Sequence, residues 1–245
     1  MRLNLRAYVN NTLVHWTGRG QTNSDAFSAL ASICDEKLLR LSYCPNYVSE
    51  DYDKKSAMVC FTDIPLWHAK EHCRIFGKFG IGFKKEKMIS YGTNPALYTT
   101  GEHFSRINSL SGLLGRMEDL EKDREWKEGV EPYNFTQDET VAFQEVTDLL
   151  QEYSYKGQDN SEYVTYYQRE WRLTFRSLPF AGGRKPQEPG MSCFYCRDGK
   201  GYSTVKFSTD DVDYIVVPAR YWLKGRKLAK QISCKLRVYE LSVFI

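Results

Sequence analysis

The sequence lacks the features that would direct the protein into a membrane or out of the cell. None of its 245 residues belongs to an apolar run approaching the roughly 18 residues that a membrane helix needs. The segment from Met1 to Ala7 is too polar for a signal peptide, so we expect a cytoplasmic protein without a membrane partner. Seven cysteines, an odd number in a long chain, then favour reduced thiols over a disulfide framework.

Several catalytic patterns are also missing. The sequence contains no Walker A loop, no GxGxxG motif, no Gly-x-Ser-x-Gly elbow and no His-Glu-x-x-His. Only four histidines are present, which restricts histidine-dependent chemistry. Zinc ligation by His68, His72 and the Cys193-x2-Cys196 pair is an alternative. However, the two halves lie far apart in the sequence and a single CxxC is a weak signal, so we expect no metal.

The net charge is only +3, which is mild for a nucleic-acid-binding protein. Basic residues do cluster in Lys84–Lys87 and Lys224–Lys230, and we interpret both clusters as solvated surface. Nucleic acid is therefore an alternative partner that the composition does not favour.

The order of the predicted elements indicates an α+β fold in a single domain over residues 1–245. Helical spacing of apolar residues predicts helices over 25–37, 103–127 and 138–152, with a short helix from about Pro65 to Phe76. Strand signals cover 2–9, 12–16, 58–61, 81–83, 163–167, 171–175, 212–218 and 237–243.

Two polar residues in predicted strands are candidate catalytic groups. His15 ends a strand, and Glu170 lies among strand formers, where burial is costly unless the carboxylate is paired or belongs to a site. Strand alternation predicts Gln168, Glu170 and Arg172 on one face. Glu170 and Arg172 are then either a structural ion pair, or Glu170 stabilises the oxocarbenium that forms when a bond to nicotinamide breaks. Phe61 is either core or a ring that contacts a ligand.

The sequence His15-Trp16-Thr17, followed by a helix and Leu39-Arg40-Leu41, resembles the start of ADP-ribosyltransferase folds, with Trp16 at the usual glycine position. This resemblance implies an ADP-ribosyltransferase-like fold, a split antiparallel or mixed sheet core with flanking helices. It also implies an NAD cofactor, with His15 holding a ribose hydroxyl and Glu170 acting on the glycosidic bond. Phe61 would stack on nicotinamide, and Arg19 would meet the pyrophosphate. The complete set of implied NAD-binding residues is His15, Trp16, Thr17, Arg19, Phe61, Gln168 and Arg172.

A set of ordered blocks between residues 13 and 175 resembles the AbiGi abortive-infection proteins. The blocks are Val59–Leu66, His72, Phe76–Gly82, Lys85-Glu86, Asn94–Tyr98 and Arg169–Arg172. The resemblance implies phage defence, and AbiGi proteins are described as the antitoxin half of a pair whose toxin looks like a nucleotidyltransferase.

The motifs and the two resemblances leave two functions open. The first is an enzyme that transfers ADP-ribose or cleaves NAD. The second is a non-catalytic antitoxin that binds a toxin or a phage component. In the second case exposed aromatic residues would anchor the interface, and the candidates are Trp16, Trp67, Tyr163 and Trp222.

Overall fold

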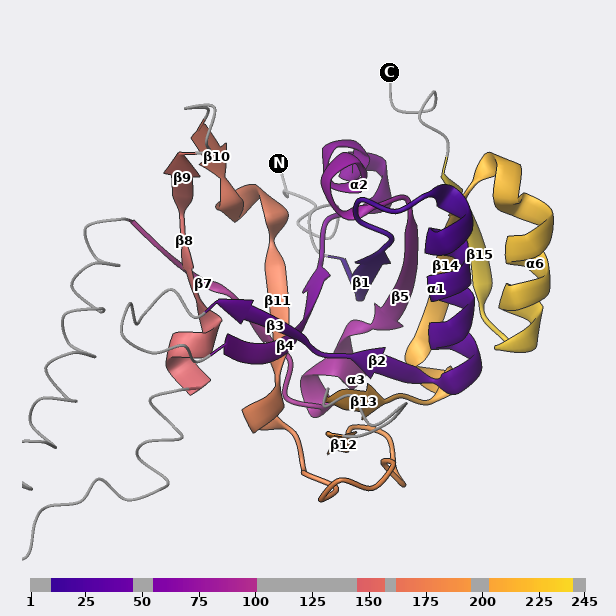
Figure 1. Ribbon diagram of the computed structural model, residues 1–245. Helices are drawn as coiled ribbons and strands as arrows, with labels where there is room; N and C mark the ends of the chain where they lie inside the picture. Colours follow the sequence, from indigo (N-terminus) through magenta and orange to yellow (C-terminus); the bar gives the residue numbers. More distant parts are fainter. Residues whose placement is uncertain (1–9, 46–54, 101–144, 157–161, 195–202, 240–245) are drawn as a thin grey trace, which may run out of the picture. The chain divides into compact units, whose positions relative to one another are not determined.

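The computed structural model describes residues 10–45, 55–100, 145–156, 162–194 and 203–239 (Figure 1). The chain divides into two compact units: Met1–Ser42, Ala57–Pro95 and Gln168–Ile245 form the first, and Tyr43–Ser56 and Ala96–Tyr167 the second. The single domain over 1–245 stays a prediction. The expected strand 2–9 and helix 103–127 lie outside the described residues.

A mixed sheet forms the centre of the first unit, in the order β15-β14-β5-β1-β4-β11-β6 (Figure 1). The α+β class is therefore confirmed. In this path β14 and β15 run parallel and the other neighbours antiparallel. The strands are β1 (Thr12–Thr17), β4 (Lys55–Thr62), β5 (Phe79–Lys84), β6 (Asn94–Pro95), β11 (Glu170–Thr174), β14 (Val212–Pro218) and β15 (Lys235–Tyr239).

Helices cover both faces of this sheet. Helices α1 (Asn23–Glu36) and α6 (Trp222–Gln231) pack on one face, through a core that includes Leu13, Phe61 and Phe83. On the other face lies α2 (Lys70–Phe76), whose Cys73 packs in a smaller cluster. We call these the core face and the α2 face.

Close contact between strands depends on a glycine in β5. Gly82 lies against the ring of Tyr214, and a Cβ at this position would come 2.5 Å from that ring. Glycine at this position therefore permits the close approach of the Tyr214 ring of β14 to β5.

Shorter elements complete the first unit. An antiparallel sheet joins β12 (Ser192–Cys193), β13 (Thr204–Lys206) and β2 (Leu38–Arg40). The remaining elements are η2 (Leu66–His68), α3 (Lys85–Ser90), η4 (Phe175–Ser177), η5 (Thr209–Asp211) and η6 (Ala219–Tyr221).

The second unit contains two strand pairs and a tyrosine cluster. Strand β7 (Leu97–Thr99) pairs in parallel with β8 (Leu150–Glu152), and β9 (Ser154–Lys156) pairs antiparallel with β10 (Glu162–Val164). The rings of Tyr98 and Tyr153 both contact Tyr166. Strand β3 (Ser42–Pro45) and η3 (Thr165–Gln168) span the unit boundaries.

Local differences from the sequence predictions have identifiable causes. Helix α1 begins at Asn23, before the predicted residue 25, because the Thr22 side chain accepts a hydrogen bond from the Asp25 amide and caps the helix. The helix expected over 138–152 ends at residue 149, since pairing with β7 places residues 150–152 in a strand. No helix among the described residues is both long and apolar enough to cross a membrane.

Candidate functional site

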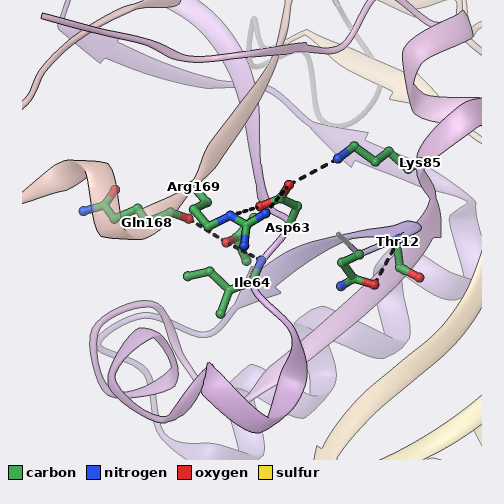
Figure 2. A network of polar contacts seen from close by, with 8 residues as sticks. Thr12, Asp63, Ile64, Lys85, Gln168 and Arg169 are labelled. Carbon is green, nitrogen blue, oxygen red and sulfur yellow. Dashed lines mark hydrogen bonds and ion pairs between the residues drawn. The ribbon is translucent and has the colours of Figure 1, made fainter. Parts of the chain in front are cut away.

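A charged network lies where β4 ends and β11 begins (Figure 2). The Asp63 carboxylate, whose side chain is 8% exposed, directly follows β4. Its Oδ1 is 2.6 Å from Nε of Arg169, and its Oδ2 accepts hydrogen bonds from Arg169 at 3.1 Å and from Lys85 Nζ at 3.2 Å. Two cations thus surround one carboxylate, and the group carries a net positive charge.

The backbone at this junction has an unusual conformation that a hydroxyl group holds in place. Arg169 has φ +46°, in the left-handed region that non-glycine residues seldom adopt. The Thr62 hydroxyl donates to the Gln168 carbonyl at 2.6 Å, and the Asp63 amide donates to the Arg169 carbonyl at 3.4 Å. Left-handed residues of this kind cluster at functional sites, which makes this junction a candidate.

This turn corrects the predicted strand alternation. Gln168 ends the 3-10 helix η3, and the left-handed Arg169 separates it from β11. The two-residue period therefore begins only at Glu170, and Gln168 does not continue the face of Glu170 and Arg172. The predicted strand 163–167 is likewise a strand only to Val164.

An aromatic ring adjoins the same network. Lys85 Nζ lies 4.2 Å from the centroid of the Trp171 ring, within the range of a cation–π interaction. Trp171 pairs directly with Phe61 across β11 and β4. Lys85 thus contacts both a carboxylate and an indole at the edge of the core face.

A second charged pair occupies the α2 face. Arg172 Nε donates to Glu170 Oε1 at 3.0 Å, and the two side chains are 7% and 11% exposed, respectively. This confirms the structural alternative, in which Glu170 and Arg172 form a same-face ion pair. A carboxylate held in this way is already stabilised by charge and hydrogen bonding.

Aromatic side chains lie beside this pair. The ring of His72 stacks on Phe76 at 4.4 Å and lies 6.1 Å from the ring of Trp16. Burial lowers the pKa of His72 to about 4, and the negative charge of Glu170 partly offsets this effect. His72 is therefore neutral at pH 7.

Trp16 itself is 8% exposed, which contradicts its expected role as an exposed interface anchor. Its strand position places it on the sheet, where α2 covers it. In the described structure its buried Nε1 has no hydrogen-bond partner.

His15 lies on the core face of β1. Its Nδ1 is 3.0 Å from the Cys60 carbonyl oxygen, and since a carbonyl only accepts, Nδ1 carries the hydrogen. Burial lowers the pKa of His15, and this hydrogen bond partly offsets the effect. Its ring meets Phe61 edge-on at 5.9 Å.

The strand register determines which candidates meet. Val14 pairs with Thr62, and Thr62 pairs with Glu170, so these three side chains share the α2 face. His15, next to Val14, points to the opposite face. The structure therefore brings His15 and Phe61 together, and separately Trp16, Glu170 and Arg172, but it does not bring His15 and Glu170 onto one face.

The remaining candidates lie near the end of β1. Thr17 pairs with Phe79 at the last position of the strand. Arg19 is exposed, with its guanidinium carbon 5.6 Å from the centroid of Phe76. Arg19 thus adjoins the aromatic residues of the α2 face.

The structure also bears on the predicted state of the cysteines and on possible metal ligands. Cys193 is disulfide-bonded, which corrects the expectation of reduced thiols at this position. Cys34, Cys60, Cys73 and Cys234 are not in disulfides. Within the described ranges, no group of three or more His, Cys, Asp or Glu side chains could hold a metal ion.

The charged network was not predicted from individual residues, although the sequence contained a signal for it. Asp63, Lys85 and Arg169 each lie in one of the blocks that carry the AbiGi resemblance, and His72 forms another. These blocks are distant in sequence, and the fold brings three of them to one junction (Figure 2).

Comparison with known proteins identifies the family. The family described as "Putative abortive phage resistance protein AbiGi, antitoxin" matches residues 28–218, which is 191 of the 245 residues. Neither a curated protein nor a solved structure matches the sequence. Because the match covers well over half of its length, the chain belongs to the AbiGi family of abortive phage resistance proteins.

Proposed function

We propose that this protein is an antitoxin of an abortive-infection pair and that it acts by binding a toxin protein rather than by consuming NAD. The family description supports the antitoxin role and a toxin partner. The observation that favours binding over catalysis is the strand register, which places His15 and Glu170 on opposite faces of the sheet.

ADP-ribosyl transfer or NAD cleavage remains a prediction with a defined geometric requirement. His15 and Glu170 would have to reach the same nicotinamide ribose, because catalysis requires reacting groups a few ångströms apart. The sheet lies between them, and the Glu170 carboxylate contacts Arg172. The transferase-like NAD cleft therefore has less support than the binding role.

The segment from η2 to α2 is the surface best suited to contact the toxin. Ala69 and Cys73 attach it to the sheet, whereas Trp67 is 62% and Ile75 45% exposed. Exposed tryptophans are frequent anchors of protein interfaces. Only Ile64 and Pro65 separate Asp63 from the start of this segment at Leu66, so the charged network holds the chain just before it.

Growth rescue and co-purification test this proposal. The protein is co-expressed with the product of the neighbouring gene, as the candidate toxin, and we expect growth rescue together with a stable complex. Trp67→Ala should weaken the complex by about 30-fold, the loss typical of an interface anchor. Trp222→Ala, at another exposed tryptophan, is the matched control and should leave the complex unchanged.

An NAD assay separates the two functions. The purified protein is incubated with NAD, with and without cell extract, and nicotinamide release is measured for wild type and Glu170→Gln. Release by wild type that Glu170→Gln abolishes would overturn the binding-only function, provided that circular dichroism shows both proteins folded. We expect no release in either case.

A further inference from the structure

The C-terminal part of the first unit concentrates positive charge. Residues 214–239 contain no Asp or Glu and seven cations: Arg220, Lys224, Arg226, Lys227, Lys230, Lys235 and Arg237. Because the whole chain has a net charge of +3, the rest of it carries −4. The mild overall charge thus conceals a strongly basic segment.

Helix α6 presents most of these cations to solvent. Its buried residues are Gly225, Leu228 and Ala229, which pack towards β14 and β15. The opposite side carries Arg226, Lys227 and Lys230, at the spacing that forms one helical stripe. Together with Lys224 and with Arg220 of η6, which are also exposed, they form a surface that we call the α6 basic face.

These cations have no carboxylate partner among the described residues. In the part of the chain that the structure describes, no ion pair involves any of the five residues, whereas Lys235 is paired with Asp213 at 2.8 Å. Lys224 and Lys227, like Arg226 and Lys230, are neighbours of equal charge along the helix, an arrangement that destabilises an isolated helix. A bound polyanion would remove this repulsion.

The scaffold beneath this surface is preformed. A Cβ on Gly225 would come 2.8 Å from Val217 Cγ2, so the helix lies close against β14. At its C-terminal end Gln231 donates a hydrogen bond to Asp35 of α1 at 2.7 Å. The cations are therefore mounted on a fixed helix, which limits the ordering cost of binding.

The residue types favour nucleic acid over an acidic protein. Three of the five cations are lysines, which are depleted in protein interfaces but suit phosphate contacts. The Trp222 side chain, 44% exposed, lies beside them, with the Arg226 guanidinium carbon 5.7 Å from its ring centroid. Aromatic rings among cations offer stacking surfaces to bases. We propose that the α6 basic face binds the phosphodiester backbone of a nucleic acid.

Fluorescence anisotropy with a labelled 20-base-pair DNA duplex and a 20-nucleotide single-stranded RNA tests this inference. Wild type should bind at least one of them, and the affinity should fall as salt rises from 50 to 200 mM. If about four phosphates are neutralised, the slope of log K against log salt is about −3 to −4. The two probes distinguish a duplex from a single strand.

Charge reversal locates the site. Lys227→Glu combined with Lys230→Glu should reduce the slope by about 2 and the affinity on the order of 50-fold at 0.1 M salt, because two phosphate contacts are lost. Lys87→Glu combined with Lys185→Glu makes the same change in net charge at two other exposed lysines and should have little effect. Circular dichroism and thermal melting check that both variants fold.

Three outcomes would overturn the inference. They are no binding of wild type at 50 mM salt, equal losses in both double variants, and equally tight binding of poly-glutamate through the same residues, which would indicate an acidic protein partner. The inference does not depend on toxin binding. Trp67→Ala should retain nucleic-acid binding, and the α6 double variant should retain the toxin complex.

Discussion

The two faces of the main sheet bury different chemistry, although the same strands form both. The core face packs apolar side chains from α1, α6 and the sheet, with Phe79, Ile81, Phe83 and Leu173 fully buried. The α2 face buries the Glu170–Arg172 ion pair and the neutral His72 beside Trp16. On β11, Arg172 and Leu173 are consecutive residues that serve the two faces.

Apolar packing is enough to explain the side chains of the core face. The buried charges of the α2 face need a further explanation. Apolar burial stabilises any compact fold roughly in proportion to area. A buried ion pair is often no more stabilising than well-packed apolar residues of similar size. Its presence on the α2 face, next to the junction held by Asp63, is therefore consistent with a role in positioning the segment proposed to contact the toxin.

Removing one partner of the ion pair should have the largest effect. Arg172→Met leaves the Glu170 carboxylate buried without this cation, and we expect the free energy of unfolding to fall by about 3–5 kcal/mol. Adding Glu170→Leu should restore most of this loss, because both charges are then absent. Urea unfolding at pH 7.5 measures both changes.

The neighbouring residue provides the control for the core face. Leu173→Ala should cost about 2–5 kcal/mol through the cavity that it leaves. Adding Glu170→Leu to this variant should recover nothing and should cost further stability, because it leaves the buried Arg172 guanidinium without this carboxylate. If Arg172→Met costs less than about 1 kcal/mol, the two faces do not differ in the way described.

The next effect should come from the pH dependence of stability, through the buried histidine of the α2 face. The pKa of His72 is lowered from its ordinary 6.5 to about 4 in the folded protein. As pH falls below 6.5 the unfolded chain takes up a proton at this residue and the folded protein does not. His72 should thus remove about 3 kcal/mol of stability between pH 6.5 and 4.

His72→Phe removes this contribution and keeps an aromatic ring against Phe76. We expect its stability to fall less than that of wild type between pH 7.5 and 4, by about 3 kcal/mol. His68→Phe, at an exposed histidine that precedes His72 by four residues, should retain the wild-type pH dependence. If stability falls equally with pH in wild type and in His72→Phe, the folded protein does not lower the pKa of His72.

The elements of this comparison differ in how far the sequence predicts them. The predicted strand 212–218 has the same bounds as β14, because a continuous apolar run between turn signals is typical of a buried strand. The pairing of Glu170 with Arg172 also followed from alternation within one strand. The opposite faces of His15 and Glu170 did not, because they depend on the register of three strands that are distant in sequence.

Two further features had weak or absent local signals. The left-handed Arg169 lies in a sequence without Gly or Asn, so nothing local indicated the turn before β11. Helix α6 is predicted from the sequence only as a basic cluster, Lys224–Lys230. The spacing of Gly225, Leu228, Ala229 and Ile232 was a helical signal, which the basic residues between them obscured.

The smallest effect should come from the hydroxyl that holds the turn of Arg169. Thr62→Val removes the hydrogen bond to the Gln168 carbonyl at 2.6 Å and the acceptor of the Ile64 amide at 3.3 Å. We expect a loss of about 1–3 kcal/mol in the free energy of unfolding and faster hydrogen exchange at the Ile64 amide, since buried polar groups lose a partner.

Thr93→Val is the matched control, because the Thr93 hydroxyl is buried without a hydrogen-bond partner in the described structure. That variant should unfold at the same urea concentration as wild type or at a higher one. Equal losses in the two variants would mean that the Thr62 hydroxyl does not hold the turn.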